Sequence, residues 1–191
     1  MRVTLLYATH SKSEDNEAGL ASGHADTPLS VRGMEQARQL GERLSGAPLD
    51  LVVCSDLQRS WRTAEIAFQD RDVPVRRDER LREIDYGDMT QAPRGLVEAQ
   101  RMSRIERPFH GGESYRLAVR RHWRLFDELA LRRAGERVLL IGHGATYAAL
   151  EHLCSGLSLH EAVRALNARE WEPLRTYEYD AAVAARQAEP A

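Results

Sequence analysis

Two histidines follow short apolar runs, at points where a buried strand would end and a loop would begin. His10 comes directly after LLYAT, and His143 comes directly after LLIG. A third apolar run, residues 51–54, leads into a helix-like segment that carries Arg59 and Arg62. Because ligands of open α/β sheets bind outside the carboxyl ends of the strands, we expect these segments to share one crevice. Two imidazoles and a guanidinium in such a crevice would suit an anionic, phosphorylated substrate.

Each of these residue types has a defined use in phosphoryl transfer. A histidine nucleophile needs one unprotonated ring nitrogen, and it needs a partner on the other nitrogen to fix the tautomer. Cations must surround the three non-bridging oxygens of the phosphoryl group, and the planar fork of arginine matches that geometry. A carboxylic acid beside the leaving oxygen can supply the proton. Glu83, within the segment LREIDYG, is the candidate for that acid.

The composition argues against several other classes of function. The chain has 191 residues, a formal net charge of −2, 42% hydrophobic residues and 29% charged residues, which is typical of one soluble globular domain. With this charge the chain has no overall attraction for nucleic acid or anionic membranes. No stretch approaches the roughly 18 apolar residues of a membrane span, and no signal-peptide pattern is present. Two cysteines without disulfide or zinc-ligand spacing favour a cytoplasmic protein.

The order of apolar and polar segments predicts the fold class. Apolar runs alternate with helix-like segments, so the economical interpretation is one three-layer α/β/α sandwich with a mostly parallel central sheet. Ser30 is suited to cap a helix, and Ser158 with Glu161 forms a capping box. We expect strands at residues 3–7, 49–54, 73–75, 137–141 and 176–179, and helices at 31–44, 56–68, 113–133, from 145 onward and after 158.

The remaining segments are expected to lack regular structure. Residues 11–28 are polar and contain glycine, which predicts a long loop, and long loops inside compact domains are often functional. Residues 78–111 are charged and irregular. A single domain is expected to span residues 1–180, and the Ala-rich tail 181–191 is expected to fray.

Five segments, in the expected order, resemble motifs of the histidine phosphatase superfamily, the phosphoglycerate-mutase-like proteins. Residues 26–33, DTPLSVRG, resemble the family's D-x-P-L-T-x-x-G segment. Residues 55–64, with SDLQR followed by RTA, resemble its S-x-L-x-R…T-A helix. Residues 81–87 match the segment that carries the acid, residues 111–114 match G-G-E-S, and residues 142–144 contain the second histidine. The resemblance extends to about residue 156 and implies a phosphoglycerate-mutase-like fold.

The resemblance also implies roles for the matched positions. His10 would form a phosphohistidine intermediate, and Arg59 and His143 would hold the transferring phosphoryl group. Glu83 would donate a proton to the leaving group. The positions that correspond to substrate contacts are Thr9, Asn16, Ser22, Gly23 and Gly144. Neither a metal nor another cofactor is implied.

The nucleophile motif departs from the family pattern. Relatives carry Arg-His-Gly, whereas this chain reads Thr9-His10-Ser11. The missing arginine contacts the phosphoryl group in relatives, and removing one preorganised donor of this kind typically lowers the rate by roughly 10²–10³, about 3–4 kcal/mol. Lys12, which is the only lysine in the chain, and Arg62, one helical turn after Arg59, are the candidates to restore the charge.

These inferences favour a phosphomonoesterase that hydrolyses a small phosphorylated substrate. A phosphoglycerate-type mutase is less favoured, because the short interval between Glu83 and Gly111 leaves little room for the extended segment of the resembling mutases. The missing arginine would instead suit a catalytically weakened relative that binds a phosphorylated ligand or a protein partner. The altered loop at residues 9–16 would suit a phosphatase for an unusual substrate. No nucleic-acid or membrane partner is expected, and a chain of this size could form a homodimer.

Overall fold

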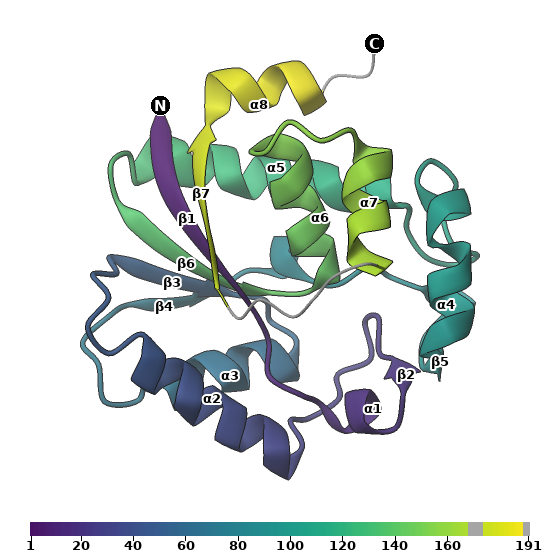
Figure 1. The fold of residues 1–191 in the computed structure, drawn as a ribbon, viewed down its shortest axis with the longest axis horizontal. Helices are drawn as coiled ribbons and strands as arrows, with labels where there is room; N and C mark the ends of the chain where they lie inside the picture. Colours follow the sequence, from purple (N-terminus) through teal and green to yellow (C-terminus); the bar gives the residue numbers. More distant parts are fainter. Residues whose placement is uncertain (168–173, 189–191) are drawn as a thin grey trace.

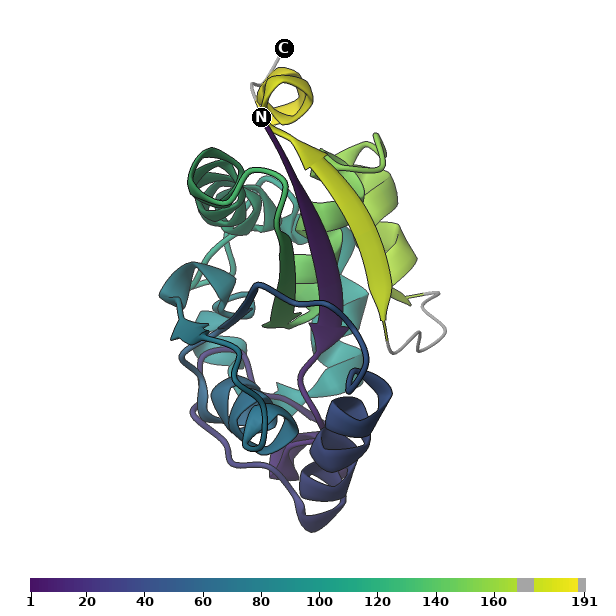
Figure 2. The same ribbon diagram turned by 90° about the vertical axis from the view of Figure 1, so that its left-hand side faces the viewer.

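A five-stranded sheet forms the centre of the molecule, with the strand order β4-β3-β6-β1-β7 (Figures 1 and 2). The structure is a computed structural model that describes residues 1–167 and 174–188. β1, β6, β3 and β4 are parallel, and β7 is an antiparallel edge strand beside β1. The strands are β1 (Arg2–Thr9), β3 (Leu51–Cys54), β4 (Val75–Arg77), β6 (Arg137–Gly142) and β7 (Arg175–Asp180).

Helices cover both faces of this sheet. In Figure 1, α2 and α3 lie below the sheet, and α5, α6 and α7 lie above it. These helices are α2 (Val31–Arg43), α3 (Gln58–Phe68), α5 (Tyr115–Arg132), α6 (Gly144–Leu153) and α7 (Leu159–Asn167). No helix in the described part of the chain is both long and apolar enough to cross a membrane.

The side chains of the central strands alternate between two hydrophobic cores. In β1, Leu5 and Tyr7 enter the core under α5 and α6, whereas Leu6 and Ala8 enter the core under α2 and α3. β3 and β6 alternate in the same way. Strands buried on both faces are nearly continuous apolar runs, which is why these segments were visible in the sequence. The predicted α/β/α sandwich with a mostly parallel sheet is confirmed.

The register brings three strand ends to one edge of the sheet. Thr9 is paired with Gly142 across β1 and β6, and Cys54 is paired with Ile141 across β3 and β6. The next residue along each strand is therefore His10, His143 or Ser55, and each stands at the carboxyl edge. The sequence predicted that the segments ending near His10, His143 and Cys54 meet at the carboxyl ends of the strands. The strand register confirms this arrangement of the backbone.

Helix caps also follow the sequence. The Ser30 hydroxyl accepts a hydrogen bond from Gly33 N at 3.0 Å, so the predicted cap of α2 is confirmed. Ser158 and Glu161 form the predicted capping box at the start of α7. The helix predicted from residue 113 begins two residues later, because Ser114 caps it by accepting from Leu117 N.

Two segments predicted as irregular contain short elements. The loop at residues 11–28 includes α1 (Glu14–Glu17) and β2 (Leu20–Ala21). Residues 78–111 include β5 (Ala92–Pro93), α4 (Arg94–Gln100) and the 3₁₀ turn η3 (Arg101–Arg104). β2 pairs with β5 in a separate two-stranded sheet. Strands of two residues and a two-turn helix are too short to produce a periodic sequence pattern.

Residues 181–188, which belong to the tail expected to fray, form α8 (Ala181–Ala188), which contacts α5 and α6 and buries Ala184 completely. The Asp180 carboxylate at the end of β7 accepts a hydrogen bond from Ala182 N at 3.0 Å. Small alanine side chains let the helix pack closely, although they give a weak hydrophobic signal in the sequence. Residues 189–191 of the predicted tail lie outside the described residues.

Close packing of α2 on α3 gives the first testable prediction. A Cβ at Gly41 of α2 would lie 2.4 Å from the carbonyl oxygen of Ala67 in α3. Alanine ordinarily stabilises a helix interior relative to glycine by about 0.5–1 kcal/mol. We expect Gly41→Ala to destabilise the protein instead, lowering the free energy of unfolding by about 1–3 kcal/mol, because backbone atoms of α3 must move.

The matched control is Gly95→Ala in α4, where no described atom lies within 4 Å of the added Cβ. This change should be neutral or stabilising by up to about 1 kcal/mol. Urea unfolding of the two variants provides the measurement. A stabilised Gly41→Ala protein would contradict the close approach of the two helices.

Candidate active site

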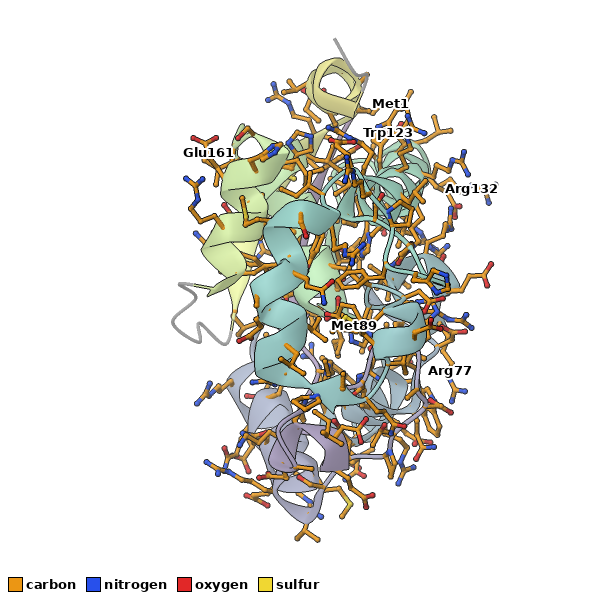
Figure 3. All side chains as sticks on the ribbon, turned by 90° about the vertical axis from the view of Figure 1, so that its right-hand side faces the viewer. Met1, Arg77, Met89, Trp123, Arg132 and Glu161 are labelled. Atoms are coloured by element: carbon orange, nitrogen blue, oxygen red, sulfur yellow. The ribbon has the colours of Figure 1, made fainter. Side chains whose placement is uncertain are left out.

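A cavity of about 710 Å³ opens at the carboxyl edge of the sheet. The loop after β1 and α4 both contribute residues to its lining, and α4 runs across the face of the molecule in Figure 3. Of the residues predicted from the sequence, those that line the cavity are Thr9, His10, Lys12, Asn16, Ser22, Gly23, Arg59, Glu83 and Gly144.

His10 is held in one tautomer by the backbone. Its Nδ1 lies 2.7 Å from the carbonyl oxygen of Ser11. A carbonyl can only accept, so Nδ1 carries a hydrogen and donates it to this oxygen. The ring is half-buried and lines the cavity. In the neutral ring this hydrogen bond favours the tautomer with the lone pair on Nε2, which is the tautomer that a histidine nucleophile attacking through Nε2 requires.

His143 lies against His10, with the two ring centroids 4.8 Å apart. Its side chain is only 1% exposed, and its Nε2 is 2.8 Å from the Ser55 hydroxyl. Nδ1 is buried without a hydrogen-bond partner among the described residues. Burial lowers the pKa of His143 well below its usual range, and the positive charge of the Arg59 guanidinium lowers that pKa further. The imidazole is therefore neutral at physiological pH.

A buried chain of hydrogen bonds positions His143 from below. The backbone N–H of His143 donates to the Thr146 hydroxyl at 3.3 Å, and that hydroxyl lies 3.0 Å from His122 Nε2. The other nitrogen of His122 donates to the carbonyl of Ala118 at 2.8 Å. Burial also lowers the pKa of His122 well below its usual range. A fixed chain of this kind connects α5 to the strand end that carries His143.

Arg59 is the largest fully buried side chain at the site. It lies in the first turn of α3 and donates to the carbonyls of Ala25 and Gly23, each at 2.8 Å. Burial lowers the pKa of its guanidinium, and the nearby charge of Glu83 opposes that shift. By holding these carbonyls, Arg59 fixes the loop that carries Ser22, whose hydroxyl is buried without a partner among the described residues.

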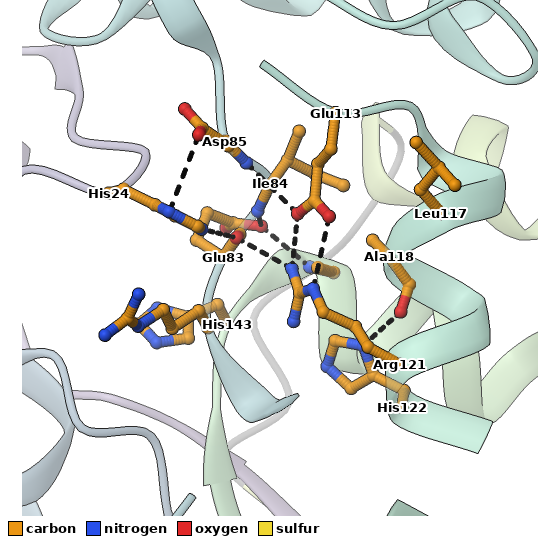
Figure 4. Close-up of polar contacts among 12 residues, drawn as sticks. His24, Glu83, Ile84, Asp85, Glu113, Leu117, Ala118, Arg121, His122 and His143 are labelled. Carbon is orange, nitrogen blue, oxygen red and sulfur yellow. Dashed lines mark hydrogen bonds and ion pairs between the residues drawn. The ribbon is translucent and has the colours of Figure 1, made fainter. Parts of the chain in front are cut away.

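Glu83 caps the N-terminus of α6 through the backbone N–H groups of Gly144 and Ala145. Figure 4 shows Glu83 in a polar network with Ile84 and Arg121. Its Oε1 accepts from Ala145 N and Ile84 N, each at 2.9 Å, and its Oε2 accepts from Gly144 N at 3.0 Å. The backbone carbonyl of Glu83 accepts from Arg121 at 2.8 Å. These contacts hold the carboxyl group at the cavity, bound to the backbone of Gly144, the residue that follows His143.

Arg62 does not line the cavity, so the structure does not place it where it would restore the charge of the missing arginine. It forms an ion pair with Glu65 one turn along α3 and lies over the Trp61 ring, and it does not line the cavity. A separation of three residues turns a side chain about 60° around the helix axis, and here that is enough to take Arg62 out of the cavity. Lys12 does line the cavity, with its Nζ 3.7 Å from Glu17.

Several cavity residues were missed in the sequence. They are Arg32 and Gln36 from the start of α2, Tyr86, and the residues of α4 and its C-terminal end. Arg94, Val97, Glu98 and Arg101 follow the spacing i, i+3, i+4, i+7, which would have indicated one face of a helix. Nothing in that spacing shows that the face lines a cavity with His10. Within the described residues, no group of three or more His, Cys, Asp or Glu side chains could hold a metal ion.

The two buried histidines predict how stability depends on pH. A histidine whose pKa is lowered by folding takes up a proton in the unfolded chain first, below about pH 6.5. The free energy of unfolding should therefore fall as the pH falls from 6.5 to 5, by up to about 1.4 kcal/mol per pH unit for each histidine. Urea unfolding across pH 5.0–7.5 measures this slope.

His122→Gln removes one of the two titrating groups and should reduce the slope by about half. Carboxylates with a lowered pKa, such as Asp56 beside Arg82, change the free energy of unfolding only at lower pH, below about 4. They therefore do not contribute to the slope between pH 5 and 6.5. An unchanged slope in His122→Gln would show that its imidazole is not the neutral, buried group described above.

Comparison with known proteins assigns the chain to a family. A family model described as "Histidine phosphatase superfamily (branch 1)" matches residues 5–183. The adenosylcobalamin/alpha-ribazole phosphatase of Escherichia coli is 44% identical over 88 residues, which are 46% of this chain and 42% of that relative's length. The chain thus matches less than half of this relative.

Other relatives match over most of their length. A 2,3-bisphosphoglycerate-dependent phosphoglycerate mutase from Parvibaculum lavamentivorans is 32% identical over 192 residues, covering 92% of this chain and 90% of the relative. A mycobacterial glucosyl-3-phosphoglycerate phosphatase complexed with VO3 superposes with a TM-score of 0.75 and 28% identity, covering 84% of this chain and 86% of that one. The resemblance inferred from the five sequence motifs is confirmed, and the chain belongs to the histidine phosphatase superfamily.

Proposed function

We propose that this chain is a phosphomonoesterase that hydrolyses a small phosphorylated substrate through a phosphohistidine intermediate at His10. The observation that carries the proposal is the hydrogen bond from His10 Nδ1 to the Ser11 carbonyl, which favours the neutral tautomer with the lone pair on Nε2 in a ring that lines the cavity. Phosphatases among the similar proteins, which act on alpha-ribazole and glucosyl-3-phosphoglycerate compounds according to their names, support the reaction class.

In the first step, His10 Nε2 attacks phosphorus, and the bond from phosphorus to the leaving oxygen breaks. Arg59 holds the non-bridging oxygens, because its guanidinium is buried at the cavity and keeps further N–H groups beyond the two bound to carbonyls. His143 lies beside the attacking ring, with the two ring centroids 4.8 Å apart, and its neutral imidazole would help to orient the phosphoryl group.

Glu83 supplies the proton to the leaving oxygen. Its Oε1 already accepts two backbone N–H groups, whereas Oε2 accepts only one, so Oε2 is the oxygen with room for a proton. In the second step, water attacks the phosphohistidine and Glu83 takes the proton from that water. The products are an alcohol and inorganic phosphate, and His10 returns to its starting tautomer.

Turnover of an aryl phosphate tests the nucleophile. We expect His10→Ala to lower kcat by at least about 10³, because no other group replaces the attacking nitrogen. A phosphorus-labelled substrate and rapid quenching without acid should leave label on the wild-type protein. Absence of label from the His10→Ala protein would locate the intermediate at His10. Equal activity in His10→Ala and the wild type would rule out covalent catalysis at His10.

Thr9→Arg tests the second candidate function, a weakened relative that binds a phosphorylated ligand. Thr9 stands where relatives have an arginine, and the observation that favours this candidate is that Arg62 does not replace it. Restoring the arginine should raise kcat by up to about 10²–10³. Measurable turnover in the wild type supports the phosphatase, whereas turnover only in Thr9→Arg favours the binding protein.

The proton donor is tested by changing the leaving group. Glu83→Gln should lower kcat for an alkyl phosphate by roughly 10²–10⁴, because an alkoxide cannot leave without a proton. The same variant should lose far less activity on an aryl phosphate whose phenolate is stable at neutral pH. Equal losses on both substrates would show that Glu83 acts by positioning α6 rather than by donating a proton.

A further inference from the structure

His24 contacts the residue proposed as the proton donor from outside the cavity. Its Nε2 is 2.9 Å from the backbone carbonyl oxygen of Glu83. A carbonyl can only accept, so Nε2 carries a hydrogen and donates it to this oxygen. Figure 4 shows His24 beside Glu83 and Asp85. His24 does not line the cavity, so any effect of its side chain on the reaction must pass through its neighbours.

The backbone of His24 is fixed by Arg59. The guanidinium donates to the carbonyls of Gly23 and Ala25, each at 2.8 Å, and these are the residues on either side of His24. Gly23 has a φ of +51°, and a Cβ at this position would lie 2.9 Å from the ring of Tyr86. The loop therefore packs closely on the segment that carries the proposed proton donor, and moving His24 away would break the hydrogen bonds of Arg59.

The carbonyl oxygen of Glu83 receives two donors. Arg121 of α5 donates to the same oxygen at 2.8 Å. A carbonyl oxygen has two lone pairs, so these two donors together use its full capacity. Arg121 also binds the carboxylate of Glu113 and the carbonyl of Arg80, which gives it a wider structural role. The peptide that follows Glu83 is thus held from two sides, by α5 and by the loop that carries His24.

Asp85 lies at the other nitrogen of the His24 ring. Its Oδ2 is 3.7 Å from His24 Nδ1. The Oδ1 atom of Asp85 accepts from Gly87 N at 2.9 Å, and its backbone N–H donates to Glu113 at 3.1 Å, so the carboxylate has a fixed position. The imidazole therefore lies between two points of the segment that carries Glu83, which sets the direction of its Nε2–H group.

We propose that His24 is a positioning residue for Glu83, and that its hydrogen bond to the backbone carbonyl keeps the carboxyl group where proton donation requires it. This inference rests on the proposed function, in which Glu83 protonates the leaving oxygen. Misplacement of a reacting group by about 1 Å can lower a rate by about 10²-fold. Because Arg59 holds the carbonyls on both sides of His24, the support of the proton donor and the proposed phosphoryl-binding residue belong to one connected unit.

Two variants at position 24 test the hydrogen bond on two esters. His24→Leu removes the donor and keeps an apolar side chain of moderate size, whereas His24→Gln keeps an N–H donor at a similar reach. We expect His24→Leu to lower the ratio of kcat for an alkyl phosphate to kcat for an aryl phosphate by about three- to tenfold, as for the loss of one hydrogen bond. His24→Gln should restore most of this ratio. KM should stay unchanged for both esters, because His24 does not line the cavity.

A double variant shows whether the effect passes through the carboxyl group. When Glu83→Gln has already removed the proton donor, adding His24→Leu should not lower the alkyl-to-aryl ratio further. The matched control is His110→Leu, since His110 also contacts a carboxylate, Asp88 at 2.6 Å, but has a side chain that is 90% exposed. This control should leave the ratio unchanged. Urea unfolding shows which variants are folded, and His24→Asn, with a shorter side chain, replaces His24→Leu if that protein does not fold.

Three results would overturn the positioning role: an unchanged ratio in His24→Leu, an equal loss on both esters, or a further fall of the ratio in the double variant. The ¹³C resonance of the Glu83 carbonyl, measured without substrate, tests the hydrogen bond separately from turnover. This resonance should shift in His24→Leu and stay in place in His110→Leu. If it shifts but the wild type hydrolyses neither ester, the proposed function fails and the positioning role falls with it, while the hydrogen bond stands.

Discussion

The shared ending of three parallel strands is the constraint on which the site depends. β3, β6 and β1 are neighbours in the sheet, and their pairing places His10, Ser55 and His143 in one row. Alternate residues of a strand face opposite sides of the sheet. A shift of one residue in the pairing register of any strand would therefore move its apolar side chains from one hydrophobic core to the other. Burial of apolar side chains on both faces therefore fixes the distance between the two imidazoles.

The same burial removes the polar groups of the site from water, so these groups need partners within the protein. Arg59 and His143 are removed from water, and each is held by a fixed partner: backbone carbonyls bind the guanidinium of Arg59, and the Ser55 hydroxyl binds Nε2 of His143. Glu83 is fixed in turn by backbone N–H groups at the start of α6. Groups that are already oriented and desolvated need no reorganisation when charge develops on a substrate, which is where electrostatic stabilisation is most effective.

The sequence was informative where a residue's position follows from a long element. His10 and His143 follow continuous apolar strands, and Glu83 and Arg59 lie in recognisable motifs, so all four were found. Arg62 was misplaced because its spacing from Arg59 says nothing about Glu65 and Trp61, which hold it elsewhere. The residues of α4 that line the cavity were missed because a pair of two-residue strands positions this helix. Such contacts depend on tertiary structure and leave no local pattern.

The threonine at position 9 bears on the energetics of the proposed catalysis. Without the motif arginine, a simple phosphate ester would meet one cation fewer at the phosphoryl group. Binding energy from a remote, non-reacting part of a substrate can offset such a loss, provided it is used to hold the reacting group in the geometry of the transition state. Under the proposed function, the change at position 9 would therefore make turnover depend on how firmly the cavity holds the non-reacting end of the substrate.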